Sequence, residues 1–340
     1  MQHPRLNLGI IGFTPQHQAL IAAQLSLNRA QPVSQDAYSQ FDEMRHPVWQ
    51  ITHFSEANAL VLNAQAMASS NQYEVRFHTD TAQGDIVGLR PSELALPCAV
   101  VGQLDPAVQA LMPAGTPHTV LSDPRSIIHT LQYFEASLRP LRTLYALALQ
   151  LSERQDELDN KHTYHLEHQS VLQAIVDVPR QRVMVRESLR PHDVDDAAWL
   201  SRPASANNQP AGFMLWMVEE LMWILALHGS EMPLPERYFV RPVHLRRMPR
   251  VRSSLLVPRH AVLLKLLSQR PWHWLDLAAA LGAQTDAQKK QLQRDMYALY
   301  ICRAITTQPR SNPATSTQPG NLTSEGEGEH HLPTMTGDLI

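Results

Sequence analysis

The sequence predicts an α/β fold for the N-terminal part of the chain, followed by an α+β middle region and a mostly helical C-terminal module. Three observations support this division. Short apolar runs alternate with helical stretches up to residue 138, a leucine-rich helical pattern follows, and short helices punctuated by proline and glycine come near the end. The expected parts are an α/β domain (1–138), a helical linker (139–168), an α+β region (169–256), a helical module (257–307) and a disordered tail (308–340).

The strands expected in the N-terminal domain are short and apolar. The first begins at Leu6, and Thr14-Pro15 after it has the pattern of a helix start. The residues that follow carry an apolar stripe, which predicts an amphipathic helix. Further strands are expected at 48–54, 59–63, 97–103 and 117–123. Strands that alternate with helical stretches favour a mostly parallel sheet.

The order of these elements over residues 6–138 resembles the flavodoxin-like receiver domain of two-component response regulators. In that family the strand ends gather an acidic pair, a phospho-accepting aspartate, a hydroxyl residue and a lysine, and magnesium is held there during phosphoryl transfer. The corresponding positions in this sequence are occupied by Phe13-Thr14-Pro15, Asn63, Gly102-Gln103 and Ser122-Asp123.

Asn63 stands at the position of the phospho-acceptor. A carboxamide cannot form the acyl phosphate that an aspartate forms. The resemblance therefore implies a degenerate receiver, or pseudo-receiver, that is not phosphorylated. Segment 66–96 also departs from the family, because it is partly extended and rich in turns. The alternative is an unrelated small α/β domain in which Asn63 is a loop residue.

The linker has a leucine face. Leucines recur on one side of a helix at Leu141, Leu144, Leu147, Leu151 and Leu158. This face could pack on its own domain, or the helix could project and form a homodimer. The same segment holds His162, His165 and His168 at intervals of three, which could ligate a metal. Because that spacing drifts around a helix and no second cluster accompanies it, solvated histidines are the preferred interpretation.

The middle region contains a predicted hairpin and a predicted apolar helix. Two apolar runs flank Pro179-Arg180, which is the pattern of a hairpin. Residues 213–229 predict a helix whose only charged residues are Glu219 and Glu220. Since this segment is short and carries two carboxylates at its middle, it is expected to be a core helix and not a membrane anchor.

Residues 257–307 resemble a winged helix, with Thr285 or Asp286 as the N-cap of a third helix. In DNA-binding proteins of this kind the third helix enters the major groove. The polar residues expected on its exposed face are Gln288, Lys289, Gln291, Gln293 and Arg294. Many winged helices dock proteins or dimerise instead, so the helix alone does not decide the partner.

An arginine-rich run precedes this module. Residues 237–270 contain nine Lys and Arg and no Asp or Glu, in a chain of net charge −3. Such a run implies an anionic partner, or an internal acidic face such as the stretch with Asp193, Asp195 and Asp196. The residues expected to contact nucleic acid or another anionic ligand are Arg241, Arg246, Arg247, Arg250, Arg252, Arg259, Lys289, Lys290, Gln293 and Arg294.

Residues Arg246 to Arg250 also resemble the RxxxR element of cyclic-di-GMP sites in PilZ-type domains. The second motif of that family, D/NxSxxG, is absent. A cyclic-dinucleotide effector is therefore a minor alternative.

The functional expectation is a cytoplasmic, phosphorylation-independent transcriptional regulator that joins a pseudo-receiver to a DNA-binding winged helix. No GxSxG, HExxH or phosphate-loop pattern occurs, and the two cysteines, Cys98 and Cys302, are far apart. An enzyme, a cofactor, a metal and membrane insertion are therefore not expected. The alternative from another class is a non-catalytic adaptor that docks proteins in bacterial signalling, for instance in pilus or motility systems.

Overall fold

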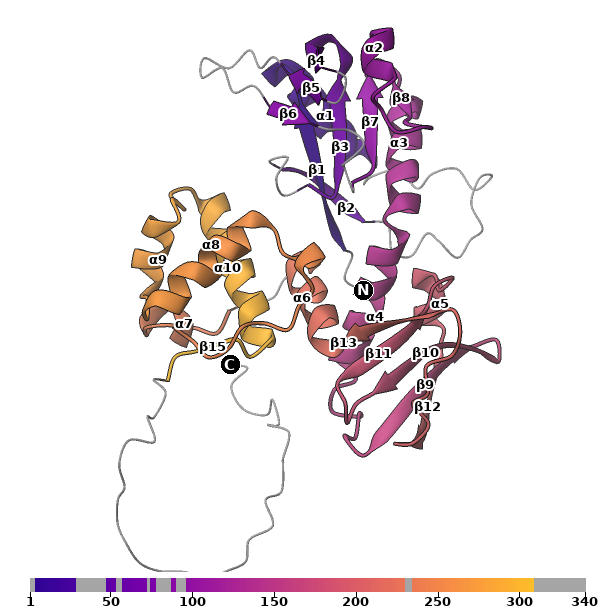
Figure 1. The fold of residues 1–340 in the computed structure, drawn as a ribbon, viewed down its shortest axis with the longest axis vertical. Helices are drawn as coiled ribbons and strands as arrows, with labels where there is room; N and C mark the ends of the chain where they lie inside the picture. The colour runs from indigo at the N-terminus through magenta and orange to yellow at the C-terminus, as the bar shows by residue number, and fades with distance from the viewer. Residues whose placement is uncertain are drawn as a thin grey trace, which may run out of the picture.

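The computed structural model describes residues 4–28, 47–52, 57–71, 74–77, 87–89, 96–229 and 234–308. Figure 1 shows three parts: an α/β domain in indigo and purple, a sheet with helices in magenta and pink, and a helical module in orange and yellow. Apart from residue 308, the predicted tail lies outside the described residues. Within the described ranges, no helix has the length and apolar character needed to cross a bilayer.

The N-terminal domain is built on a five-stranded parallel sheet. Its strands are β1 (Arg5–Ile11), β2 (Val48–Thr52), β3 (Ala59–Asn63), β7 (Cys98–Val101) and β8 (His118–Thr119). Their order is β2-β1-β3-β7-β8, and each neighbouring pair is parallel. In order of appearance this is 2-1-3-4-5, the order of flavodoxin-like folds. The prediction of a parallel α/β sheet is confirmed.

Both faces of this sheet are covered, which explains the continuous apolar strand sequences. On one face, α1 (Pro15–Asn28) and α3 (Pro124–Ser137) enclose a cluster that includes Leu8, Val61 and Phe134. On the other face, Leu60, Leu62 and Val100 pack with Val108 of the short helix α2 (Pro106–Gln109).

A small antiparallel sheet follows β3, in the segment that departs from the receiver pattern. It consists of β4 (Met67–Asn71), β5 (Glu74–Phe77) and β6 (Val87–Leu89), in the order β4-β5-β6. The 3₁₀ helix η3 (Ala64–Ala66) leads into it. The expectation that 66–96 is partly extended is confirmed for the residues described.

The predicted linker is mostly core. Helix α4 (Arg139–Glu153) follows α3 after a break at Leu138. Leu144, Leu147 and Leu151 are buried against the middle sheet, so this leucine face is covered within the chain. The prediction that the helix continues to residue 168 is wrong. Residues 162–168 form a strand because they pair with strands on both sides.

The middle region is a five-stranded antiparallel sheet with helices on one face. Its strands are β9 (His162–His168), β10 (Val171–Asp177), β11 (Arg182–Arg186), β12 (Ala198–Pro203) and β13 (Phe213–Met217). Their order is β12-β9-β10-β11-β13, and the predicted hairpin is the β10–β11 pair. Helices α4, α5 (Pro191–Asp195) and α6 (Val218–His228) pack together on its core face.

The predicted helix 213–229 is corrected in part. Residues 213–217 form β13, which pairs with β11, and only residues from Val218 onward are helical. Cross-strand pairing therefore prevails over the helical pattern for these five residues.

In the described residues, the C-terminal module contains four α-helices, a 3₁₀ helix and a pair of short strands. Its elements are α7 (Arg237–Val240), β14 (His244–Leu245), η5 (Ser253–Leu255), α8 (Pro258–Gln269), α9 (Trp274–Ala280), α10 (Asp286–Ile301) and β15 (Ile305–Thr306). Leu277 of α9 shares a core with Leu292 and Met296 of α10. Thr285 caps α10, and its hydroxyl accepts a hydrogen bond from the Gln288 amide.

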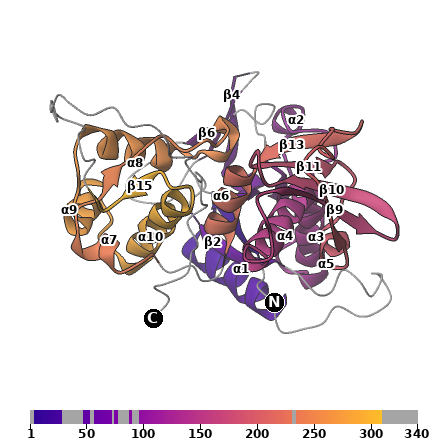
Figure 2. The ribbon, with the colours of Figure 1, turned by 90° about the horizontal axis from the view of Figure 1, so that it is seen from below.

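Helix α6 belongs to two cores. Leu221 and Ile224 pack with α4 and the middle sheet, whereas Trp223 and Ala226 pack with the C-terminal module. Figure 2 shows α6 between α4 and α10, and both helices contact it. Beyond its first turn, which carries Glu219 and Glu220, the helix is apolar on the two sides that face these cores.

Candidate functional site

Asn63 lies at the carboxyl end of β3 and ties two loops together. Its Nδ2 donates a hydrogen bond to the Gly12 carbonyl after β1, at 2.7 Å. Its Oδ1 accepts a hydrogen bond from the Gln65 amide at 3.1 Å, which caps η3. Both functional groups of the carboxamide are thus used in closing this edge of the sheet.

The described residues at the neighbouring strand ends form no acidic cluster. Asp105 and Asp123 are the acids that follow β7 and β8, and each accepts a hydrogen bond from the first turn of the next helix. After β1, the Thr14 hydroxyl lies 3.2 Å from Nδ1 of His17. Among the residues that the structure describes, no group of three His, Cys, Asp or Glu side chains is arranged to hold a metal ion.

In the arginine-rich run, Arg247 is paired inside the molecule. Its guanidinium donates to both oxygens of Glu219 on α6, at 2.9 and 3.0 Å. It also donates to the Cys302 carbonyl at 2.6 Å. The backbone amide of Arg250 adds a hydrogen bond to Glu219 at 2.7 Å. This segment is therefore fastened to α6 and to the end of α10.

Arg252 forms a second bidentate pair, with Glu220 on α6. Its Nε and Nη2 donate to the carboxylate at 2.8 and 2.9 Å, and its guanidinium lies 3.7 Å from the ring centroid of Trp216. Burial acts to raise the pKa of Glu220, but hydrogen bonds from Arg252 and from the Met217 amide outweigh this effect. The pKa therefore lies below its ordinary value.

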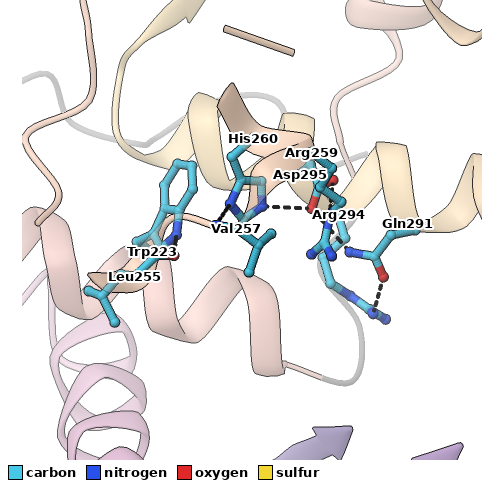
Figure 3. A network of polar contacts seen from close by, with 8 residues as sticks. All are labelled: Trp223, Leu255, Val257, Arg259, His260, Gln291, Arg294 and Asp295. Carbon is cyan, nitrogen blue, oxygen red and sulfur yellow. Dashed lines mark hydrogen bonds and ion pairs between the residues drawn. The ribbon is translucent and has the colours of Figure 1, made fainter. Parts of the chain in front are cut away.

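A third pair joins α8 to α10 (Figure 3). Arg259 donates to Oδ2 of Asp295 at 2.8 Å, and Nε2 of the buried His260 lies 3.2 Å from Oδ1. The Val257 amide donates to Nδ1 of His260, so that nitrogen is the acceptor and Nε2 carries the proton. Burial acts to raise the pKa of Asp295, yet the hydrogen bond from His260 and the charge of Arg259 hold it below its usual value.

We shall call the three pairs Arg247–Glu219, Arg252–Glu220 and Arg259–Asp295 the arginine clasp. They place three of the residues expected to bind an anionic ligand in internal ion pairs. The sequence suggested the stretch from Asp193 to Asp196 as an internal acidic partner, but these three arginines pair with Glu219, Glu220 and Asp295 instead. The Asp193 carboxylate instead accepts a hydrogen bond from the Arg190 amide and lies 3.1 Å from His192.

Other residues of the predicted set stay at the surface. The side chains exposed to solvent are those of Arg241, Arg246, Arg250, Lys289 and Lys290, whereas Gln293 and Arg294 are half-buried. Arg294 donates to Gln291 at 3.4 Å, and Gln291 donates to Asp295. The face of α10 that was predicted to contact DNA is therefore exposed to solvent at the start of the helix and partly buried farther along.

The module as a whole is strongly basic. Residues 234–308 contain thirteen Lys and Arg but only four acids, Glu236, Asp276, Asp286 and Asp295. Glu219 and Glu220 of α6 neutralise two of these arginines in the clasp. A clear excess of positive charge remains. The rest of the chain carries a larger negative excess, because the total is −3.

Glu219 and Glu220 were recognised in the sequence as the only charges of their helix, but their pairing with Arg247 and Arg252 was not predicted. Two adjacent carboxylates in an otherwise apolar helix were a usable signal, since buried acids are almost always paired. The histidines at 162, 165 and 168 lie on β9, where helical spacing has no meaning. His165, for example, uses Nε2 in a hydrogen bond with the Ala206 carbonyl at 2.9 Å.

The fold places the N-terminal domain in the class of flavodoxin-like α/β proteins, and the strand ends lack an acidic site among the described residues. Comparison with protein-family models, curated proteins and solved structures finds no match to this chain.

Proposed function

We propose that the protein is a phosphorylation-independent regulator, acting in the cytoplasm, in which a pseudo-receiver is coupled to a nucleic-acid-binding module. The pseudo-receiver assignment is supported by the sheet order and by Asn63, whose amide spans two loops where the receiver family carries its acceptor. A carboxamide in this role stabilises the edge of the sheet and offers no acceptor for a phosphoryl group.

The observation that carries the output half of the proposal is the charge of the C-terminal module. Thirteen basic residues against four acids in a compact helical unit is typical of an electrostatic footprint for nucleic acid. We assign the module to the winged-helix type because three helices pack beside the short pair β14–β15, with Trp272 bridged to Val243. On this assignment, Lys289 and Lys290 at the start of α10 contact DNA.

A second candidate, a protein-docking adaptor, is favoured by exposed apolar side chains on the same module. Leu275 of α9 is 74% exposed and Val240 of α7 is 64% exposed. Such an adaptor would show little dependence on salt. The cyclic-dinucleotide alternative keeps both motif arginines at the surface, because Arg246 and Arg250 are exposed, but the second motif of that family is absent.

DNA binding is tested by fluorescence anisotropy of a labelled duplex of about 30 bp, titrated with the full chain at several salt concentrations. Affinity should fall steeply with salt, since each phosphate contact displaces counterions. Lys289→Ala/Lys290→Ala should reduce the slope of log K against log salt by about 2 and weaken binding at low salt. A phosphoryl donor with Mg²⁺ should leave the affinity unchanged.

The matched control is Arg182→Ala, which removes an exposed basic residue from β11 of the middle sheet. It should leave binding as in the wild type. Absence of binding at the lowest salt would refute the DNA assignment and leave the adaptor as the better proposal.

A further inference from the structure

Two polar contacts join the amino edge of the parallel sheet to the helices beside it. Nδ1 of His228, the last residue of α6, lies 2.9 Å from the carbonyl oxygen of Arg5, the first residue of β1. The indole of Trp49 on β2 donates to Glu135 of α3 at 3.3 Å, and Glu135 lies 4.0 Å from Arg142 of α4.

Both contacts are made by residues at the start of neighbouring strands. Trp49 is aligned with Leu6 in the sheet, one residue beyond Arg5. Asn63 and the other strand ends lie at the opposite, carboxyl edge, because the strands are parallel. Figure 1 shows the amino edge pointing toward α4 and α6.

The charges of Arg259 and Arg294, two members of the network in Figure 3, act on His228. A carbonyl oxygen can only accept, so Nδ1 of His228 carries the proton and donates. Burial lowers the pKa of His228; the hydrogen bond to Arg5 opposes this, and the charges of Arg294 and Arg259 lower the pKa further. The ring is therefore neutral at neutral pH, and these two arginines lie near the point where the N-terminal domain touches α6.

Arg259 and Arg294 are both half-buried, in contrast to the exposed Lys289 and Lys290. All four residues lie on α8 or α10. The difference in exposure, together with the effect of the Arg259 and Arg294 charges on His228, distinguishes a side of the module near the His228–Arg5 contact from a side that is open to solvent.

We propose that the amino edge of the parallel sheet is an autoinhibitory contact that covers the Arg259–Arg294 side of the C-terminal module. That this side is covered does not depend on whether the module binds nucleic acid. Its consequence, restricted access of nucleic acid to Arg294, rests on the proposed function. Loss of the Arg5–His228 hydrogen bond uncovers Arg294 and strengthens binding.

The covering is tested by the rate of maleimide labelling at a cysteine introduced by Arg294→Cys in the full chain. The native thiols Cys98 and Cys302 are both buried, so background labelling is slow. Adding His228→Ala should accelerate labelling at position 294 by about three- to tenfold, the factor expected for one lost hydrogen bond. His228→Asn keeps an amide donor near the position of Nδ1 and should label as slowly as the parent.

Two further variants complete the labelling experiment. Trp49→Phe removes the indole donor to Glu135 while keeping a ring against Phe134, and it should accelerate labelling in the same direction. Lys290→Cys reports an exposed position and should label rapidly with or without His228→Ala. Equal rates at position 294 in the parent, His228→Ala and Trp49→Phe proteins would overturn the proposal.

The consequence for binding is measured with the labelled duplex and the native Arg294. His228→Ala should bind about three- to tenfold more tightly than the wild type, and His228→Asn should bind equally. Faster labelling without tighter binding, in a protein that does bind DNA, would overturn autoinhibition. If no variant binds DNA, the proposed function fails and the labelling rates alone decide whether the side is covered.

Discussion

The C-terminal module uses basic side chains in two different ways. The arginine clasp holds Arg247, Arg252 and Arg259 against carboxylates that are at most 15% exposed, whereas Lys289 and Lys290 at the start of α10 lie in solvent. The difference is one of desolvation. A buried carboxylate needs a partner to remain ionised, so the clasp is structural, while exposed lysines remain able to meet an external anion.

Breaking the clasp at Glu220 should have the largest effect on stability. Arg252→Ala leaves a carboxylate that is 5% exposed without its bidentate partner, although backbone amides still donate to it. We expect a loss of about 2–3 kcal/mol in the free energy of unfolding, measured by urea denaturation. Arg252→Lys retains the charge but loses the fork geometry and should lose less. A change below about 0.5 kcal/mol in Arg252→Ala would contradict a structural role.

Replacing Asp295 should cause a smaller loss in the free energy of unfolding, and this loss should depend on pH. Its folded-state pKa is lower than its ordinary value of 3.8, so the ionised carboxylate stabilises the fold above that pH. This stabilisation is lost as pH falls below 3.8 toward the folded pKa. Asp295→Asn should cost about 1–2 kcal/mol at neutral pH, because one acceptor oxygen and the charge are lost.

The measurement is urea denaturation of wild type and Asp295→Asn from pH 6 to pH 3. The difference in unfolding free energy between them should shrink toward the acidic end. A difference that stays constant over this range would show that Asp295 is not ionised in the folded protein.

The exposed lysines should give the smallest effect on stability. Lys289→Ala/Lys290→Ala removes no internal partner among the described residues, so the free energy of unfolding should change by less than about 0.5 kcal/mol. Thermal unfolding followed by circular dichroism measures this change. A larger loss would show that the start of α10 belongs structurally with the clasp, which would remove the contrast between the two regions.

Several features of the fold were readable from the sequence because they depend on local pattern. Apolar runs that alternate with helical stretches predicted the parallel sheet, and the Thr285 cap predicted the start of α10. That an amide and not an aspartate stands at the acceptor position was likewise visible, since Asn63 ends a strand whose bounds could be placed. Segments 162–168 and 213–217 were assigned wrongly to helices because cross-strand partners distant in sequence decide their conformation.

By itself, the sequence determined that residues 237–270 are basic and that positive charge is concentrated near the C-terminal end. Only the tertiary structure decided which of those charges are already neutralised. Glu219 is 28 residues from Arg247, Glu220 is 32 from Arg252 and Asp295 is 36 from Arg259. Ion pairing depends on the distance between side chains after packing, and helix α6 brings its two carboxylates to the arginines because its apolar faces are shared by both cores.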